Sequence, residues 1–314
     1  MAGPHRGPAG GLGVAICTYR RPDGLARLLA ALPEGLAGVA EPVMVVVVDN
    51  DGGDPRVAEV VAAAGLDVRF AVETRPGISA ARNRALALAA GAGVRWLALI
   101  DDDEWPEARW LAALLARRDE TGAAVVGGVV EPCFPAGAER LARFRRFWSV
   151  LPQARGGRPF VHATSNVLLD LAALRGLAFD EAHGLSGGGD LVFFSRLFER
   201  GVPMAWAESA RVREEVSRER ASLAWLARRR RRVGNHMVMD EEARQGRLRP
   251  VLKTLGLLAR LPAYPLLGRE PGARLLGWRM EAVKIAGRLA AHRGRRSYEY
   301  ARDGVTERPV ARGT

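Results

Sequence analysis

The sequence of 314 residues contains little cysteine and no long apolar run. Its two cysteines are Cys17 and Cys133, so no disulfide framework is implied, and we expect a reducing, cytoplasmic compartment. Residues 1–10 are rich in Gly and Pro but lack the apolar core of a signal peptide, which predicts a disordered leader. The best candidate span, residues 251–267, holds charged residues and prolines and is shorter than the roughly 20 apolar residues that a spanning helix needs. The sequence therefore predicts no membrane span.

Two phosphate-binding patterns are also missing from the sequence. The first predicted strand is followed by CTYRRPDG, which is not the G-x-G-x-x-G of dinucleotide-binding enzymes. The chain has no G-x-x-x-x-G-K-[ST] loop either. These absences argue against a Rossmann dehydrogenase and a P-loop enzyme. Any phosphate must be held in another way, such as through a metal ion on carboxylate oxygens.

Charge is distributed unevenly along the chain, although the formal net charge is +12. Residues 1–210 hold 22 Lys and Arg against 24 Asp and Glu, a net of −2, whereas residues 211–314 hold 25 against 11, a net of +14. This asymmetry predicts a boundary near Arg211 and a polyanionic partner for the second part.

Strand and helix patterns alternate over the first hundred residues. Such alternation implies an α/β fold with a parallel sheet and right-handed crossovers. The four predicted strands are Leu12–Thr18, Pro42–Val48, Asp67–Glu73 and Trp96–Ile100. The helical patterns between them run through the leucines of residues 25–32, through Val57–Ala64, and from Ser79 as a predicted N-cap.

Four consecutive acids follow the fourth predicted strand, in the segment WLALIDDDEWPEARW of residues 96–110. Adjacent carboxylates repel one another and need water or a cation, so a divalent metal would satisfy Asp101, Asp102 and Asp103. Pro106 suits the first turn of a helix, which predicts that the acids occupy a strand-to-helix loop. The alternative is a solvated acidic turn in which Asp103 or Glu104 caps the helix.

Six segments carry a resemblance to a known family. The sequence is similar to the family 2 glycosyltransferases of the GT-A fold over roughly residues 13–207. The resemblance implies a mainly parallel central sheet flanked by helices and an inverting, hexosyltransferase-type reaction. A sugar would move from a nucleotide-diphosphate donor to a hydroxyl of a glycan or lipid-linked glycan, with Mg²⁺ or Mn²⁺ bridging the diphosphate. The six segments are VAICTYRRPDGL, VVVVDNDGGD, ETRPGISAARNRAL, LALIDDDEWP, TSNVLL and GGGDLVFFSRLFERG.

The resemblance assigns roles to residues near the donor nucleotide. It places Thr18 and Tyr19 beside the nucleotide and lets Asp49 read the base, which for a UDP-sugar would be through the imide N–H of uracil. Arg82 would approach the phosphates, for which its fork of donors is suited. Asn166 would lie near the sugar. The alternative for Asp49 is an Asx residue that forms the turn in VDNDGG.

The acidic loop and Asp190 would carry the chemistry. The D-x-D pattern makes Asp103 the direct metal ligand, with Asp101 on the ribose or a metal-bound water and Asp102 less clearly defined. Asp190 would be the general base that takes the proton from the acceptor hydroxyl. Its alternative role is a helix N-cap after the glycine run. Gly189 stands where many relatives have Glu, which removes a second acid beside the base.

The basic second part carries five successive arginines, Arg228–Arg232, within a segment that matches a W-L-x-R-R-x-x-x-x-G-N pattern of similar glycosyltransferases. These arginines would serve the donor diphosphate or the phosphate of the acceptor. A helical stripe of Leu275, Trp278, Ala282, Ile285 and Leu289 would pack on the catalytic domain or lie on an anionic inner leaflet.

The expected organisation is a leader at 1–10, a catalytic GT-A domain at 11–210 and a basic helical extension at 211–314. The protein would be peripheral on the cytoplasmic membrane and act on a polyprenyl-linked acceptor. No aromatic stacking platform accompanies the arginine run, so no nucleic-acid partner is expected. The alternative is a basic protein on a catalytically weakened GT-A scaffold, binding nucleic acid or an anionic membrane.

Overall fold

The computed structural model describes residues 10–183, 188–266, 271–297 and 307–309. The predicted leader, apart from Gly10, lies outside these residues, as does the start of the predicted glycine turn at Leu185. The chain forms two compact units. The second unit includes two segments that precede residue 211, so the units do not follow a single cut near Arg211. Unit 1 is Met1–Cys133, Ser149–Asp180 and Phe193–Glu215, and unit 2 is Phe134–Trp148, Glu181–Val192 and Val216–Thr314.

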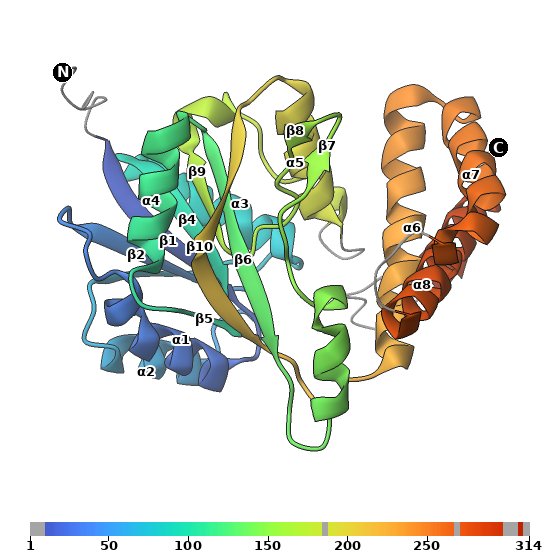
Figure 1. The fold of residues 1–314 in the computed structure, drawn as a ribbon. Helices are drawn as coiled ribbons and strands as arrows, with labels where there is room; N and C mark the ends of the chain where they lie inside the picture. The colour runs from blue at the N-terminus through green and yellow to red at the C-terminus, as the bar shows by residue number, and fades with distance from the viewer. Residues whose placement is uncertain (1–9, 184–187, 267–270, 298–306, 310–314) are drawn as a thin grey trace. The chain divides into compact units, whose positions relative to one another are not determined.

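Unit 1 is built on an eight-stranded sheet in the order β3-β2-β1-β4-β9-β6-β10-β5, with helices on both of its faces (Figure 1). The mainly parallel α/β fold expected from the sequence is confirmed. Antiparallel pairs occur at β4–β9, β9–β6 and β10–β5. The strands are β1 (Gly11–Thr18), β2 (Val43–Asp49), β3 (Val68–Val72), β4 (Val94–Asp101), β5 (Glu104–Pro106), β6 (Val125–Cys133), β9 (Val167–Asp170) and β10 (Met204–Glu215).

The first four strands agree with the sequence pattern, and in β1, β2 and β4 the apolar runs are buried in the sheet, whereas β3 is only partly buried. Val45–Val48 of β2 are buried, as are Leu97–Ile100 of β4. Thr18 is in register with Asp49, and Cys17 with Asp101. The carboxyl ends of β1, β2 and β4 therefore meet at one edge. The helices of this unit are α1 (Pro22–Gly35), α2 (Pro55–Ala63), α3 (Ile78–Gly91) and α4 (Trp110–Thr121), with the second half of α5 (Gly189–Glu199).

The acidic turn joins two strands, so the predicted strand-to-helix loop is wrong. Pro106 ends β5, which pairs antiparallel with β10, and α4 begins only at Trp110 after a left-handed Arg109 (φ 61°). β5 lies at the edge of the sheet, where a proline removes no ladder hydrogen bond. No side chain caps α4, so neither Asp103 nor Glu104 is its N-cap.

Asn166 connects β6, β10 and α4 inside the sheet. Its backbone is left-handed (φ 55°), and its amide donates to the carbonyls of Val129 (2.9 Å) and Ala210 (2.8 Å). Its Oδ1 accepts from Trp110 Nε1 at 2.7 Å. A Cβ at Gly128 would lie 2.4 Å from this amide. The fully buried side chain is therefore committed to the sheet, not directed to a sugar.

Unit 2 contains three long helices. In α6 and α8 two glycines allow a close crossing: a Cβ at Gly234 would lie 1.9 Å from the carbonyl oxygen of Lys284, and one at Gly287 would lie 1.9 Å from that of Arg231. Only glycine fits at both positions without moving a helix. The helices are α6 (Leu223–Gln245), α7 (Leu248–Arg260) and α8 (Pro271–His292), accompanied by 3-10 helices at Glu139–Phe147, Glu181–His183 and Leu261–Leu266 and the short strands β11 (Arg295–Ser297) and β12 (Glu307–Pro309).

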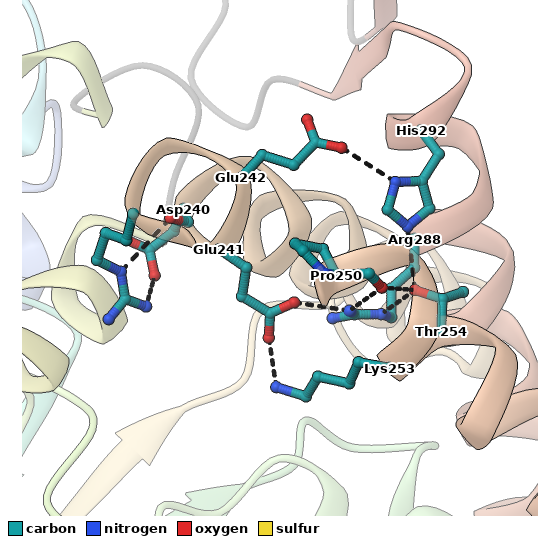
Figure 2. Close-up of polar contacts among 9 residues, drawn as sticks. Asp240, Glu241, Glu242, Pro250, Lys253, Thr254, Arg288 and His292 are labelled. Atoms are coloured by element: carbon teal, nitrogen blue, oxygen red, sulfur yellow. Dashed lines mark hydrogen bonds and ion pairs between the residues drawn. The ribbon is translucent and has the colours of Figure 1, made fainter. Parts of the chain in front are cut away.

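Charged side chains hold the same three helices together (Figure 2). Arg288 of α8 is fully buried and donates to Glu241 Oε2 of α6 at 2.7 Å and to Thr254 Oγ1 of α7 at 2.9 Å. Lys253 of α7 also pairs with Glu241. His292 contacts Glu242 and Thr254, each at 3.1 Å. Partners on the neighbouring helices make the burial of these groups tolerable, although Arg288 Nη1 finds none within the described residues.

The predicted stripe of α8 is only partly correct. Ile285 is buried, but Leu275 is 58% exposed, and the neighbouring face with Leu276 and Met280 enters an apolar cluster instead. Arg288, which is not part of that stripe, is fully buried and paired with Glu241. No helix within the described residues is long and apolar enough to span a bilayer.

Candidate functional site

The three aspartates of the acidic turn have different surroundings. Asp102 is buried and accepts hydrogen bonds from Thr18 Oγ1 (2.9 Å), the Tyr19 backbone N–H (3.3 Å) and Arg21 Nη1 (2.9 Å). Burial raises the pKa of Asp102, although Arg21 and Thr18 work to lower it. A Cβ at Gly24 would lie 2.4 Å from the Asp102 carbonyl oxygen. Asp102 therefore ties the turn to the segment that follows β1.

Asp101 and Asp103 are the more accessible carboxylates. The side chain of Asp101 is 38% exposed, and its Oδ1 lies 3.5 Å from Arg82 Nη2. The side chain of Asp103 is 15% exposed and pairs with Arg21 Nη1 at 2.8 Å. The sequence indicated this pair, but the cation beside Asp103 was missed, since Arg21 precedes it by 82 residues.

Glu104, which the sequence pattern offered only as a helix cap, has a different role in the structure. It is buried, and its Oε2 accepts the backbone N–H of Asp101 at 3.0 Å. Burial, and then the charges of Asp101 and Glu214, raise its pKa well above the ordinary value. In the sequence Glu104 looks like the other three acids beside it. Only the pairing of β5 with β10 turns its side chain inward. Glu104 thus holds the backbone from which Asp101 projects.

Asp49 lies fully buried at the end of β2, and its carboxylate organises the loop after that strand. Oδ1 accepts from the Asp51 N–H (2.9 Å), while Oδ2 accepts from the N–H groups of Gly53 (3.1 Å) and Asp54 (3.0 Å). This is the Asx-type turn considered as the alternative role. The Thr18 carbonyl accepts from the Asn50 N–H at 2.9 Å, which joins this loop to the end of β1.

Arg82 enters the site from α3. Its guanidinium lies over the ring of Phe179, 5.6 Å from the centroid, and the residue is buried. The predicted cap of this helix is wrong: α3 begins at Ile78 after Gly77, whose φ of 112° favours glycine. Ser79 is buried inside the first turn, and its Oγ finds no hydrogen-bond partner among the residues that the structure describes. Arg82 is consequently carried by a helix whose start depends on glycine geometry.

Tyr19 and Cys17 complete the end of β1. Tyr19 is 37% exposed, and the Arg20 guanidinium lies 5.0 Å from its ring centroid. Burial raises the pKa of Cys17 to about 12, although Arg82 works to lower it. The thiol is therefore protonated near neutral pH and unsuited to act as a nucleophile. Tyr19 is the exposed aromatic surface at this edge.

Asp190 belongs to unit 2 and stands at the start of α5, where it is half-buried. Gly188, two residues earlier, has a φ of +80°, and a Cβ there would lie 3.0 Å from His236 Nδ1 of α6. The glycine run thus lets the chain approach His236. Of the predicted site residues, the structure gathers Thr18, Tyr19, Asp49, Arg82, Asp101, Asp102 and Asp103 at one edge of the sheet in unit 1.

The acidic turn fits a divalent metal only in part. Within the described part of the chain, no group of three or more His, Cys, Asp or Glu side chains is arranged to hold an ion. The carboxylates of Asp101 and Asp103 are part-exposed and already attract guanidinium groups. Hard oxygen ligands suit Mg²⁺ or Mn²⁺, and diphosphate oxygens can fill further positions. These residues fit an ion that arrives with a diphosphate, not a closed all-protein site.

The fold and this edge define a class of protein. A mainly parallel sheet with carboxylates and an arginine at the carboxyl ends of its strands is an arrangement for a phosphorylated ligand. Residues 13–176 match the model of the family described as Glycosyl transferase family 2. The chain belongs to this family and is a glycosyltransferase.

Two known proteins are similar to this chain, one in sequence and one in fold. The chain is 38% identical over 229 residues to the succinoglycan biosynthesis protein ExoM of Rhizobium meliloti (strain 1021), covering 70% of this chain and 72% of that protein. It also resembles the structure of the mannosyltransferase PcManGT from Pyrobaculum calidifontis in complex with GDP-Man and Mn²⁺. That likeness has a TM-score of 0.54 at 18% identity, over 90% of this chain and 87% of the other, and shows the shared fold.

Proposed function

We propose that this glycosyltransferase is a metal-dependent, inverting enzyme that takes a sugar from a nucleotide-diphosphate donor, with a UDP-sugar as the first candidate. The accessible Asp101 and Asp103 pair at the end of β4 carries the proposal. Each carboxylate lies beside an arginine, so the turn combines ligands for a cation with donors for phosphate oxygens. This combination suits a metal–diphosphate group.

Asp103 would hold the Mg²⁺ or Mn²⁺ directly, and Asp101 would contact the ribose or a metal-bound water. When bound, the ion supplies Lewis-acid stabilisation of the charge that grows on the departing diphosphate. Arg82 donates to the phosphate oxygens from α3. Asp102 keeps the turn in place through Thr18 and the Tyr19 N–H.

The nucleoside is proposed to lie beside Tyr19 and the Asp49 loop. Asp49 Oδ1 accepts one backbone N–H and keeps a lone pair for the imide N–H of uracil. Because the residue is fully buried, this contact requires the loop after β2 to move when the donor binds. Asp49 Oδ2 already accepts hydrogen bonds from two backbone N–H groups. The buried carboxylate would then reject a base that presents no donor at that position, because the remaining acceptor would stay unpaired.

Asp190 is proposed as the general base. Its carboxylate takes the proton of the acceptor hydroxyl while the hydroxyl oxygen forms a bond to the anomeric carbon. The bond from that carbon to the diphosphate oxygen breaks on the opposite face, and its electron pair leaves with the diphosphate. Attack from the face opposite the leaving group inverts the anomeric configuration.

The acceptor is proposed to be a glycan or a polyprenyl-linked glycan in polysaccharide assembly, at the inner face of the cytoplasmic membrane. The relationship to ExoM, a succinoglycan biosynthesis protein by name, favours this setting. The second candidate is a catalytically weakened scaffold that binds nucleic acid or an anionic membrane. The excess of 25 basic over 11 acidic residues in 211–314 favours that one.

Thermal shifts with UDP-, GDP- and dTDP-sugars, with and without Mn²⁺, test the donor. We expect a metal-dependent shift with one nucleotide class, and conversion of that donor to the free nucleoside diphosphate when an acceptor is added. Shifts with oligonucleotides alone, and none with any donor, would support the scaffold.

Asp190→Asn tests the base. Loss of a general base lowers kcat by about 10²- to 10⁴-fold, while the thermal shift produced by the donor remains. Asp180→Asn removes another half-exposed carboxylate that lies outside the proposed chemistry and serves as control. Wild-type turnover in Asp190→Asn would remove Asp190 from the mechanism.

A further inference from the structure

Three exposed leucines of unit 2 form a row along α7. Leu248 is 70% exposed, Leu252 58% and Leu255 54%. Because they are four and three residues apart, they lie on one face of the helix, and the exposed Ala259 continues that face. Single exposed apolar side chains are ordinary on a protein surface, but a contiguous apolar row indicates an interaction site.

The opposite face of α7 packs inside unit 2 and fixes the orientation of the helix. Pro250 and Thr254 are buried there, and Arg288 donates to the Pro250 carbonyl (3.3 Å) and to Thr254 Oγ1 (2.9 Å), as Figure 2 shows. Leu252 is two residues from both, which places it about 160° around the helix from each. The hydrogen bonds that hold the inner face therefore keep the leucines turned outward.

Basic residues border the leucine row along one side. Arg249, Lys253 and Arg260 recur at spacings of four and seven residues, and all three are exposed. Lys253 already pairs with Glu241, so Arg249 and Arg260 supply the charge at this border. In the sequence, residues 243–269 contain six Lys and Arg and no Asp or Glu. The outer surface of α7 thus combines apolar side chains with positive charge.

A lipid bilayer with anionic headgroups fits both features of this helix. An amphipathic helix of this type lies in the plane of the interface, with its apolar face among the acyl chains. The negative surface potential of the membrane attracts the basic side chains at the level of the headgroups. The 13 residues of α7 span about 20 Å, less than the roughly 30 Å of a hydrocarbon core. The helix would lie on the membrane and not cross it.

We propose that α7 binds an anionic membrane surface through Leu248, Leu252 and Leu255, with Arg249 and Arg260 beside the lipid phosphates. The inference rests on the membrane setting of the proposed function and names the surface that provides it. The sequence pattern had offered the stripe of α8 for such a contact, but that stripe is partly buried, and the structure exposes the leucines of α7 instead.

Flotation of the full-length protein with vesicles at low salt, without donor or metal, is the first test. We expect phosphatidylglycerol vesicles to retain the wild type, phosphatidylcholine vesicles to retain little, and added salt to release it. Leu252→Gln/Leu255→Gln should weaken partitioning at least about tenfold, because two side chains lose their apolar contact with the bilayer. Gln is a good helix former, so circular dichroism should remain that of the wild type.

A matched variant changes two exposed leucines elsewhere. Leu151→Gln/Leu223→Gln alters positions that are each 39% exposed and lie outside α7, and we expect wild-type partitioning. Equal weakening in the two leucine variants would overturn α7 as the binding surface.

The charge requirement is tested with a second pair of variants. Arg249→Gln/Arg260→Gln should weaken binding to phosphatidylglycerol by about tenfold, since each basic side chain near the surface adds to the attraction. Arg218→Gln/Arg279→Gln removes two exposed arginines outside α7 and should bind as the wild type does. Equal weakening in both arginine variants would overturn the proposal in favour of general charge attraction. These changes lie at exposed positions, so this comparison stands even where a leucine variant fails to fold.

Sedimentation without vesicles tests the competing occupant, a second copy of the chain. A wild-type dimer that Leu252→Gln/Leu255→Gln converts to a monomer would overturn the membrane proposal, whereas a monomer in both supports it. Flotation uses neither donor nor acceptor, so its result is independent of the transfer assay. If the wild type does not bind phosphatidylglycerol vesicles, the proposal is refuted even when sugar transfer is intact. If vesicles bind but no transfer occurs, only the proposed function fails.

Discussion

The acidic turn of unit 1 and the charge cluster of unit 2 place carboxylates in opposite situations. Asp102 is buried with one arginine, and burial raises its pKa despite that partner. Burial also works to raise the pKa of Glu241, but hydrogen bonds from Arg288 and Lys253 outweigh it, and the pKa lies below its ordinary value. Asp102 also faces the negative charge of Asp103, whereas Glu241 faces a second cation, so the two pKa values move in opposite directions. The cluster gives its carboxylate two cationic partners, whereas the turn brings three aspartates together beside Arg21 and Arg82.

The largest effect that this contrast predicts is on catalysis. Asp103→Asn should lower turnover by about a thousandfold, because the metal supplies several kcal/mol of transition-state stabilisation. The melting temperature should stay unchanged, since the substitution removes one negative charge from three adjacent aspartates that repel one another. Donor-consumption kinetics and thermal unfolding measure both. Asp67→Asn, an exposed carboxylate at the start of another strand, should change neither. Full turnover in Asp103→Asn would show that Asp103 does not hold a catalytic metal.

The next effect is on stability and concerns the charge cluster. Arg288→Met should reduce the free energy of unfolding by about 3–5 kcal/mol, because Glu241 is left buried with Lys253 alone. Lys253→Met, which removes a half-exposed partner, should reduce it by less than about 1 kcal/mol. Denaturant unfolding provides the comparison.

A double variant separates pairing from packing in that cluster. Arg288→Met/Glu241→Met should recover part of the lost stability, because no uncompensated charge remains. A double variant as unstable as the sum of its single variants would show that Arg288 acts through packing alone.

The two regions should also respond to pH in opposite directions. Glu104 has a raised pKa, so its contribution to stability is complete below about 4.5 and is lost as pH rises through its folded-state value. Glu241 has a lowered pKa, so its contribution is present above about 4.5 and is lost as pH falls. Unfolding of Glu104→Gln and Glu241→Gln across pH 4–8, relative to wild type, should show slopes that change in opposite senses. Parallel slopes would contradict the contrast.

The smallest effect concerns the link between β1 and the turn. Thr18→Val removes the hydroxyl that donates to Asp102 at 2.9 Å and should cost about 1 kcal/mol of unfolding free energy. Thr74→Val, at an exposed position, should be neutral. If both variants unfold at the same denaturant concentration, the Thr18 bond does not hold the turn.

The local sequence pattern was sufficient to predict most strands of unit 1 and the edge at which they end. Apolar runs such as Val45–Val48 are buried on both faces of a parallel sheet, so their hydrophobicity alone marks them as strands. The alternation with helices then implies the sheet edge at which Asp49 and Asp101 meet. The family followed from the order of six motifs, and the family match over residues 13–176 confirms it.

The features that could not be predicted depend on contacts with residues distant along the chain. Pro106 lies in a strand because β10, about a hundred residues later, pairs with it. The same pairing buries Glu104 and leaves Asp101 accessible, a distinction that four identical charges in a row cannot express. Arg288 is buried because two other helices bring Glu241 and Thr254 to it.

By itself, the sequence determined the class of fold, the family and the place of the acidic turn, since these depend on local periodicity and on motif order. Only the tertiary structure decided which carboxylates lose water and which keep it. Desolvation depends on every element that packs around a group, and those elements come from far along the chain.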